Sequence, residues 1–181
     1  MSAEDRLRWD AVYAQRAVAD DEPTAPADFR SVEHHFPTAG TALELACGEG
    51  GAAVWLARRG LAVWGVDVSA TAIGRAQDRA GQWQVEHRCR FDVADLDHGL
   101  PPGPPVDVVI CQRFRAPELN TAIVDRLARG GLLAISVLSE VDAAPGRYRA
   151  ARGELHAAFG DLVPIRSDER DGIAWLLGRK R

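Results

Sequence analysis

A glycine-rich turn between an apolar stretch and a helix-like stretch is the feature that most constrains the fold. Residues 42–60 read ALELACGEGGAAVWLARRG. The apolar stretch predicts a short buried strand, and the residues from Gly51 onward predict a helix that ends at Gly60. Gly48 and Gly50 remove side chains where the backbone must bend sharply and approach a ligand closely. The unpaired amides at such a helix start favour a carboxylate, phosphate or ribose as ligand.

Strand and helix patterns alternate along the rest of the chain. Strands are predicted at 61–68, 85–93, 106–112 and 132–138, and helices at Ser69 to about Ala80, Pro117 to Arg129 and roughly Arg147 to Phe159. Two final strands, DLVPIRS and GIAWLLG, flank a DERDG turn and predict an antiparallel hairpin. This order predicts an α/β fold with a mostly parallel sheet and helices on both faces.

The first forty residues differ in pattern from the rest. A helix capped by Ser2 carries Trp9, Val12, Tyr13 and Arg16 on one face. The acidic DDEPTAP segment then predicts a flexible connection, and a second short helix is expected from Asp28 to Phe36. We therefore expect a helical extension or lid at 1–40 and one compact domain at 41–181.

Composition excludes several classes of protein. The 181 residues carry a net charge of −4, which gives no global attraction to nucleic acid or to an anionic membrane. No apolar run is long enough to span a bilayer, and the charged start lacks the apolar core of a signal peptide. Three cysteines, Cys47, Cys89 and Cys111, suggest neither a disulfide framework nor a metal site. A cytoplasmic location is the expectation.

Two acidic residues, Asp67 and Asp95, follow the glycine turn at the ends of the next two predicted strands. Asp67 ends the second predicted strand, where a carboxylate can accept hydrogen bonds from both hydroxyls of a ribose. Its alternative role, capping the next helix, is better filled by Ser69. Asp95, with Leu96 beside it, follows the third strand and can accept from an adenine amino group. Asp92 competes with Asp95 for this role, and both could instead be solvated turn residues.

Together, ELACGEG, GVDVSATAIGRAQ, DVADLDHGLP, VDVVICQ and LARGGLLAIS resemble the class I S-adenosylmethionine-dependent methyltransferases from about Thr41 to Gly178. The resemblance implies a Rossmann-like seven-stranded sheet with an antiparallel last strand, S-adenosyl-L-methionine as cofactor and S-adenosyl-L-homocysteine as product. It also implies the cofactor contacts: Glu44, Ala46, Gly48 and Gly50 at the methionine part, Asp67 at the ribose, Val68 packed on adenine, Asp95 and Leu96 at the adenine edge, and Cys111 on the pocket floor. Ala46 stands where many relatives have glycine, which implies a tighter fit.

A shorter resemblance concerns the N-terminal helix. Trp9, Asp10 and Tyr13 form a W-D-x-x-Y pattern similar to that of the small tellurite- and thiopurine-type methyltransferases. In that group the segment lies over the cofactor, which adds Trp9 and Tyr13 to the expected cofactor contacts. The alternative is that both are ordinary packing residues.

The methyl acceptor is expected after the fourth strand, where the sequence reads CQRFRAPEL. This segment lacks the Asn/Asp-Pro-Pro-Tyr pattern of enzymes that methylate base or amide nitrogens. Gln112, Arg113, Phe114 and Arg115 are the acceptor-contact candidates, Phe114 as a ring for the sulfonium or an aromatic acceptor and the arginines for an anionic one. The short segment after the fifth strand leaves little room for a substrate domain, so a small-molecule acceptor is favoured.

Two other functions compete with methyl transfer. Gly48, Gly50 and Ala53 also fit the G-x-G-x-x-A pattern of dinucleotide-binding folds, which would make the chain an NAD(P)-dependent oxidoreductase. Against it, the chain has no Tyr-x-x-x-Lys pair, and its single lysine is Lys180. The absence of a recognisable catalytic base also leaves open a non-catalytic S-adenosylmethionine-binding module.

Overall fold

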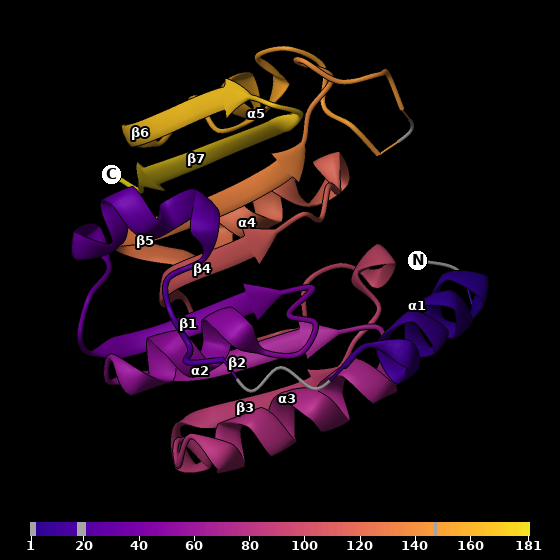
Figure 1. Ribbon diagram of the computed structural model, residues 1–181. Coiled ribbons are helices and arrows are strands. Elements are labelled where there is room, and N and C mark those ends of the chain that lie inside the picture. The colour runs from indigo at the N-terminus through magenta and orange to yellow at the C-terminus, as the bar shows by residue number, and fades with distance from the viewer. Residues whose placement is uncertain (1–2, 18–20, 147) are drawn as a thin grey trace.

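A seven-stranded sheet forms the centre of the computed structural model, which describes residues 3–17, 21–146 and 148–181 (Figure 1). The strands lie in the order β3-β2-β1-β4-β5-β7-β6. Their bounds are β1 (Gly40–Leu45), β2 (Leu61–Asp67), β3 (Cys89–Val93), β4 (Val106–Gln112), β5 (Leu127–Leu138), β6 (Val163–Arg170) and β7 (Ile173–Arg179). β7 runs antiparallel to both of its neighbours, and the pairs among β1 to β5 are parallel. The predicted α/β fold, with its antiparallel last strand, is confirmed.

Helices cover both faces of this sheet. The α-helices are α1 (Ala3–Gln15), α2 (Gly51–Arg58), α3 (Ala70–Gln82), α4 (Asn120–Arg126) and α5 (Glu154–Ala158), and the 3-10 helices are η1 (Ala27–His35), η2 (Glu86–Arg88), η3 (Leu96–His98) and η4 (Pro117–Leu119). One apolar core joins η1, α2 and α3 to the sheet, and a second joins α4 and α5 to its other face. Among the helices that the structure describes, none is both long and apolar enough to cross a membrane.

Three segments differ from the sequence expectation. The helix expected from Pro117 to Arg129 ends at Arg126, because β5 already begins at Leu127 opposite Val106. The helix expected from Arg147 to Phe159 is reduced to α5, which follows Gly153 in a left-handed conformation (φ 75°). The expected strand over 85–93 begins only at Cys89, because η2 precedes it. Ser2 and Arg147 lie outside the described residues.

The link between α1 and η1 is packed where the structure describes it. Pro23 and Ala25 are buried, and Arg79 of α3 donates to the backbone oxygen of Asp21 at 3.3 Å. The segment expected to be a flexible connection is therefore held against the domain over residues 21–26. η1 itself packs Phe29 edge-on to Trp175 of β7.

The strand order predicts where a binding crevice lies, at the carboxyl end of β1. β1 pairs with β2 on one side and with β4 on the other, so the chain changes direction across the sheet at β1. Ligands of open α/β sheets bind at such a switch point, beyond the carboxyl ends of the strands. α1 lies at that edge, beyond the arrowheads of β1 and β4 (Figure 1).

Candidate functional site

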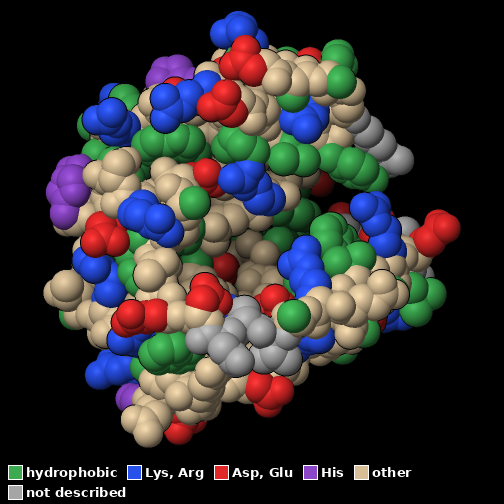
Figure 2. Space-filling model, viewed as in Figure 1, with side chains coloured by type: hydrophobic (Ala, Val, Ile, Leu, Met, Phe, Trp, Pro, Cys, Tyr) green, Lys and Arg blue, Asp and Glu red, His purple; other side chains and the backbone are tan. Residues whose placement is uncertain are grey.

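A cavity of about 400 Å³ opens at the carboxyl edge of β1, β2 and β4. Figure 2 shows this face of the molecule hollowed at its centre, with acidic and basic side chains around the hollow. The volume lies in the range typical of small-molecule and cofactor sites. The lining residues come from four parts of the chain: Trp9, Tyr13 and Arg16; Glu44, Ala46, Cys47, Gly48, Glu49 and Gly51; Asp67, Val68 and Arg79; and Gln112, Arg113 and Phe114.

The glycine turn is shaped by packing as well as by access to the cavity. Gly48 has φ 52°, and a methyl group added to it would lie 2.7 Å from the hydroxyl oxygen of Tyr13. Gly50 has φ 70°, and a methyl group there would lie 2.8 Å from Cβ of Ala76 in α3. Gly50 is absent from the cavity lining. Gly50 therefore packs on α3, whereas Gly48 and Gly51 line the cavity, and the cofactor contact of Gly50 stays a prediction.

Ala46 adopts the left-handed conformation at the end of β1, with φ 50°. This conformation costs an L-residue with a Cβ roughly 1–2 kcal/mol. Ala46 lines the cavity, and it also packs on the apolar core beneath. Ala46 is thus an alanine held in a strained backbone conformation.

Asp67 connects the turn to the end of β2. Its Oδ2 accepts from the Gly48 amide at 2.9 Å, and its Oδ1 accepts from the Ser69 amide at 2.9 Å. Burial raises the pKa of this carboxyl, although the backbone amides of Ser69, Gly48 and Val68 oppose the shift. Each oxygen keeps a lone pair that can accept from a ligand hydroxyl. Ser69 caps α3, as predicted, by accepting from the Ala72 amide.

Glu44 is the other buried carboxyl of the cavity. Its Oε2 accepts from the Ala53 amide at 2.8 Å, which ties β1 to the first turn of α2. Burial raises the pKa of Glu44 to about 8, and the charge of Asp67 adds to the shift. The side chain is therefore largely protonated at neutral pH in the structure as it stands.

The three residues of the W-D-x-x-Y pattern face two directions, two toward the cavity and one toward the start of α3. Trp9 and Tyr13 both line the cavity, with ring centroids 5.9 Å apart. Burial beside Asp67 raises the pKa of Tyr13 to about 12. Asp10 faces α3 instead: its Oδ1 accepts from the Ser69 hydroxyl at 2.6 Å and from the Thr71 amide at 3.1 Å.

Arg79 was not anticipated from the sequence. It lines the main cavity and also an adjoining cavity of about 290 Å³ beneath residues 21–27. One of its terminal nitrogens contacts Asp21 at 3.3 Å, while its buried Nε has no hydrogen-bond partner among the described residues. A stripe of Thr71, Arg75 and Arg79 at four-residue spacing was visible in the sequence, but its partners are distant in the chain.

The acceptor-contact candidates separate into two groups. Gln112, Arg113 and Phe114 line the cavity. Arg113 has φ 56°, and it pairs with Asp28 of η1 at 3.0 Å. Arg115 instead donates to Glu154 of α5 at 2.8 Å and does not line this cavity.

The adenine-edge candidates, Asp95, Leu96 and the alternative Asp92, are not among the described residues that line the cavity. Asp95 follows the end of β3 by two residues and caps η3 by accepting from the Asp97 amide. Leu96 is fully buried in the core on the other face of the sheet. Asp92, on β3, accepts from the indole nitrogen of Trp64 at 2.7 Å.

Cys111 is buried and borders a much smaller cavity together with Phe114. Of the three carboxylates expected around one bend, Glu44 and Asp67 share the cavity.

Comparisons with known proteins agree with this architecture. Residues 42–131 match the family model described as a methyltransferase domain. A search of the curated proteins gave no match. Among solved structures, TehB from Haemophilus influenzae superimposes with a TM-score of 0.75 at 16% identity, covering 96% of this chain and 67% of that one.

Two further structures show how widely the fold is used. The [4+2]-cyclase SpnF has a TM-score of 0.77 at 16% identity, covering 97% of this chain and 94% of that one. Magnesium protoporphyrin IX methyltransferase (ChlM) from Synechocystis PCC 6803, with bound S-adenosylhomocysteine, has a TM-score of 0.67 at 17% identity, covering 98% and 84%. Residues 42–131 thus form a methyltransferase domain, and the solved structures show that the chain has the fold of S-adenosylmethionine-dependent methyltransferases.

Proposed function

We propose that the chain transfers the methyl group of S-adenosylmethionine to a small-molecule acceptor that binds beside Gln112, Arg113 and Phe114. The observation that carries the proposal is that these residues, Asp67 and the glycine turn line one cavity. A small acceptor is supported by the short connection between β5 and β6, in which α5 is the one α-helix among the described residues and has five residues. Geranyl diphosphate methyltransferase and ChlM, both similar in fold, are named for small-molecule acceptors.

The cofactor-binding roles follow from the donors and acceptors that face the cavity. Asp67 accepts from the ribose hydroxyls, Val68 packs on the adenine, and Glu44, Ala46 and Gly48 surround the methionine part. Arg79 lines the cavity and supplies a cation for the cofactor carboxylate. Trp9 and Tyr13 form a wall beside the turn, so α1 covers the cavity as the lid expected within residues 1–40. Asp95, Leu96 and Cys111 stay predictions.

The chain's own contribution to the reaction is alignment. The cofactor supplies an activated methyl group on a sulfonium, so transfer needs an acceptor lone pair in line with the departing sulfur. Phe114 offers a ring face to positive charge, and Gln112 offers an amide that can orient an acceptor. Neither side chain removes a proton at neutral pH. An acceptor that is nucleophilic in its bound form, such as a thiolate, suits this site best.

Calorimetry with S-adenosylhomocysteine and with NADH, on the same preparation, tests cofactor choice. We expect binding of S-adenosylhomocysteine and none of NADH; tight NADH binding alone would overturn the proposal. Radiolabelled donor with a panel of thiols, phenols, amines and oxyanions then tests methyl transfer and the acceptor class. SpnF gives the second candidate, since this [4+2]-cyclase has the same fold. Firm S-adenosylhomocysteine binding with no labelled product across the panel would favour a non-methylating role.

A further inference from the structure

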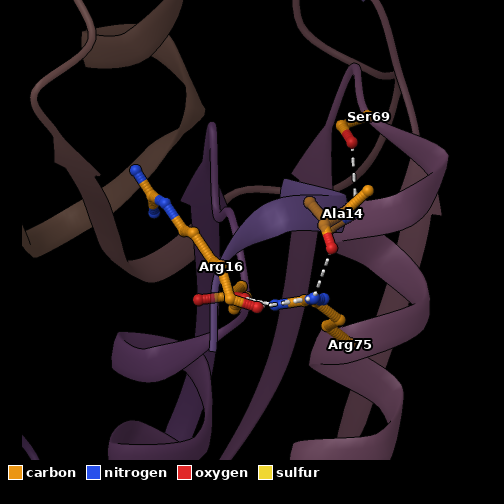
Figure 3. A network of polar contacts seen from close by, with 6 residues as sticks. Ala14, Arg16, Ser69 and Arg75 are labelled. Carbon is orange, nitrogen blue, oxygen red and sulfur yellow. Dashed lines mark hydrogen bonds and ion pairs between the residues drawn. The ribbon is translucent and has the colours of Figure 1, made fainter. Parts of the chain in front are cut away.

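Arg75 of α3 connects two elements that border the cofactor cavity. Its Nη1 donates to Oε1 of Glu49 at 2.7 Å, in the middle of the glycine turn. Its Nη2 donates to the backbone oxygen of Arg16 at 2.9 Å and approaches that of Ala14 at 3.5 Å. Figure 3 shows the guanidinium between Ala14 and Arg16, with the Arg16 side chain pointing away from it.

The chemistry of these contacts requires a guanidinium. The two ends of the planar fork serve different partners, a carboxylate on one side and carbonyls at the end of α1 on the other. A cation at the carboxyl end of a helix also meets the negative end of its dipole. A lysine ammonium is a single point charge and cannot span both partners in this geometry. The side chains of Arg75 and Glu49 are 21% and 18% exposed, so solvent screens the pair only partly.

The two partners of Arg75 shape the cavity from opposite sides. Glu49 lies between Gly48, whose amide is held by Asp67, and Gly50, which packs on α3. The end of α1 follows Tyr13, whose hydroxyl lies against Gly48. Asp10 already fixes α1 to the start of α3. Arg75 supplies the second attachment, and Tyr13 lies between the two attachments along the chain.

We propose that Arg75 is a positioning residue of the cofactor site, which makes the docking of α1 and the shape of the glycine turn one cooperative unit. Ligand binding at the turn then strengthens the docking of α1, and an undocked α1 weakens binding by loosening the turn. Arg75 itself is not among the residues that line the cavity. The inference rests on the proposed function, since it takes S-adenosylhomocysteine to bind at this turn.

The first test measures S-adenosylhomocysteine affinity by calorimetry in Arg75→Met, Arg75→Lys and Glu49→Gln. Loss of a partly buried ionic hydrogen bond predicts about tenfold weaker binding in Arg75→Met. Arg75→Lys should recover little of that loss, because it restores the charge without the fork. Arg75→Met combined with Glu49→Gln should be little weaker than either single variant. Additive losses, or full affinity in Arg75→Met, would overturn the proposal.

The second test separates positioning from general stability. Amide hydrogen exchange is measured over residues 3–17 with and without S-adenosylhomocysteine. In the unmodified chain we expect the ligand to slow exchange there, whereas in Arg75→Lys at saturating ligand this slowing should be mostly lost. Arg88→Met is the matched control, because Arg88 donates to the Gly60 carbonyl at 3.0 Å, remote from the cavity. Equal slowing in Arg75→Lys and the unmodified chain would refute the coupling.

The outcomes also separate this inference from the proposed function. If the unmodified chain fails to bind S-adenosylhomocysteine, the proposed function fails and the coupling with it. If the unmodified chain binds and the Arg75 variants bind equally well, the coupling alone is wrong. Should Arg75→Met fail to fold, Arg75→Lys and Glu49→Gln still decide the question, because each keeps a polar side chain at its position.

Discussion

The environment of Asp67 gives the strongest support among the site residues for a role in ligand binding. It is buried, its two oxygens accept from the Gly48 and Ser69 amides, and it lines the cavity. Asp67→Asn keeps an acceptor for one of these amides and removes the charge. We expect S-adenosylhomocysteine to bind about ten- to a hundredfold more weakly, from the loss of about 1.5–3 kcal/mol of charged hydrogen bonding.

Calorimetry on Asp67→Asn has a matched control in Asp92→Asn. Asp92 is a carboxylate on the neighbouring strand that accepts from Trp64 and lies outside the cavity. We expect wild-type affinity in the control. Equal weakening in both variants would remove the ribose role from Asp67 and return Asp92 to consideration.

Arg79 makes a separate prediction about the amino-acid tail of the cofactor. Its buried Nε lacks a partner among the described residues, and its side chain borders both cavities. Arg79→Met should weaken S-adenosylhomocysteine about tenfold or more, the value of one ionic hydrogen bond. Binding of 5′-methylthioadenosine, which lacks the carboxylate, should be unchanged. Similar losses for both ligands in calorimetry would show that Arg79 does not hold the tail.

Ala46 predicts a gain in stability. Its left-handed backbone costs about 1–2 kcal/mol, which glycine would not pay, while glycine loses about 0.5–1 kcal/mol of extra chain entropy on folding. Ala46→Gly should therefore raise the free energy of unfolding by up to about 1.5 kcal/mol. Urea denaturation measures the change, and Ala62→Gly, at an exposed position within β2, should lower it. A loss of stability in Ala46→Gly would mean that the Cβ contacts outweigh the strain.

At this scale the sequence predicts the positions of some residues well and the contacts of others poorly. Glu44, Asp67 and Ser69 are placed by strand ends and a helix cap, which are local features, and the structure puts them where the pattern indicates. Gly50 is different, because its neighbour Ala76 is distant in the chain. The roles of Arg75 and Arg79 likewise depend on partners that only the folded chain brings near.

At the scale of elements, α1 depends on a side chain rather than on a continuous apolar face. Asp10 accepts from Ser69 and Thr71 at the start of α3, and these hydrogen bonds lower its pKa. Asp10→Ala should free α1 and speed its amide exchange about fivefold, since a lost cap costs about 1 kcal/mol. Hydrogen exchange over residues 3–17 checks this, with Glu4→Ala on exposed α1 surface as the control. Unchanged exchange in Asp10→Ala would show that other contacts hold α1.

Element boundaries show where local pattern is insufficient. Residues 127–131 follow a helix and contain Gly130 and Gly131, so they look like a turn, yet β5 already includes them. Leu127 is buried opposite Val106, and the ladder shifts register between Val106 and Val108. Pairing with a neighbouring strand therefore outweighs the local preference of glycine for turns. The hairpin of β6 and β7 was predictable, because its turn and both strands are adjacent in the chain.

At the scale of the whole molecule, Glu44 makes the free energy of unfolding depend on pH. Its pKa is about 8 in the folded chain against an ordinary value of 4.5. Below pH 4.5 the Glu44 carboxyl is protonated in both the folded and the unfolded chain, so its burial carries no penalty from loss of ionisation. Between the two values the unfolded chain ionises and the folded chain does not, so stability falls as pH rises, and above about pH 8 the penalty is constant.

Glu44→Gln isolates this effect, because glutamine can still accept from the Ala53 amide but does not titrate. We expect the variant to gain stability over the unmodified chain progressively from about pH 5 to about pH 8, with urea denaturation of the ligand-free proteins as the measurement. Other titrating groups are common to both proteins and cancel in the difference. Glu22→Gln, at an exposed carboxylate paired with Arg58, should show no such trend. A difference between Glu44→Gln and the unmodified chain that stays constant with pH would mean that Glu44 is ionised in the folded chain, stabilised by a cation such as Arg79 that faces the same cavity.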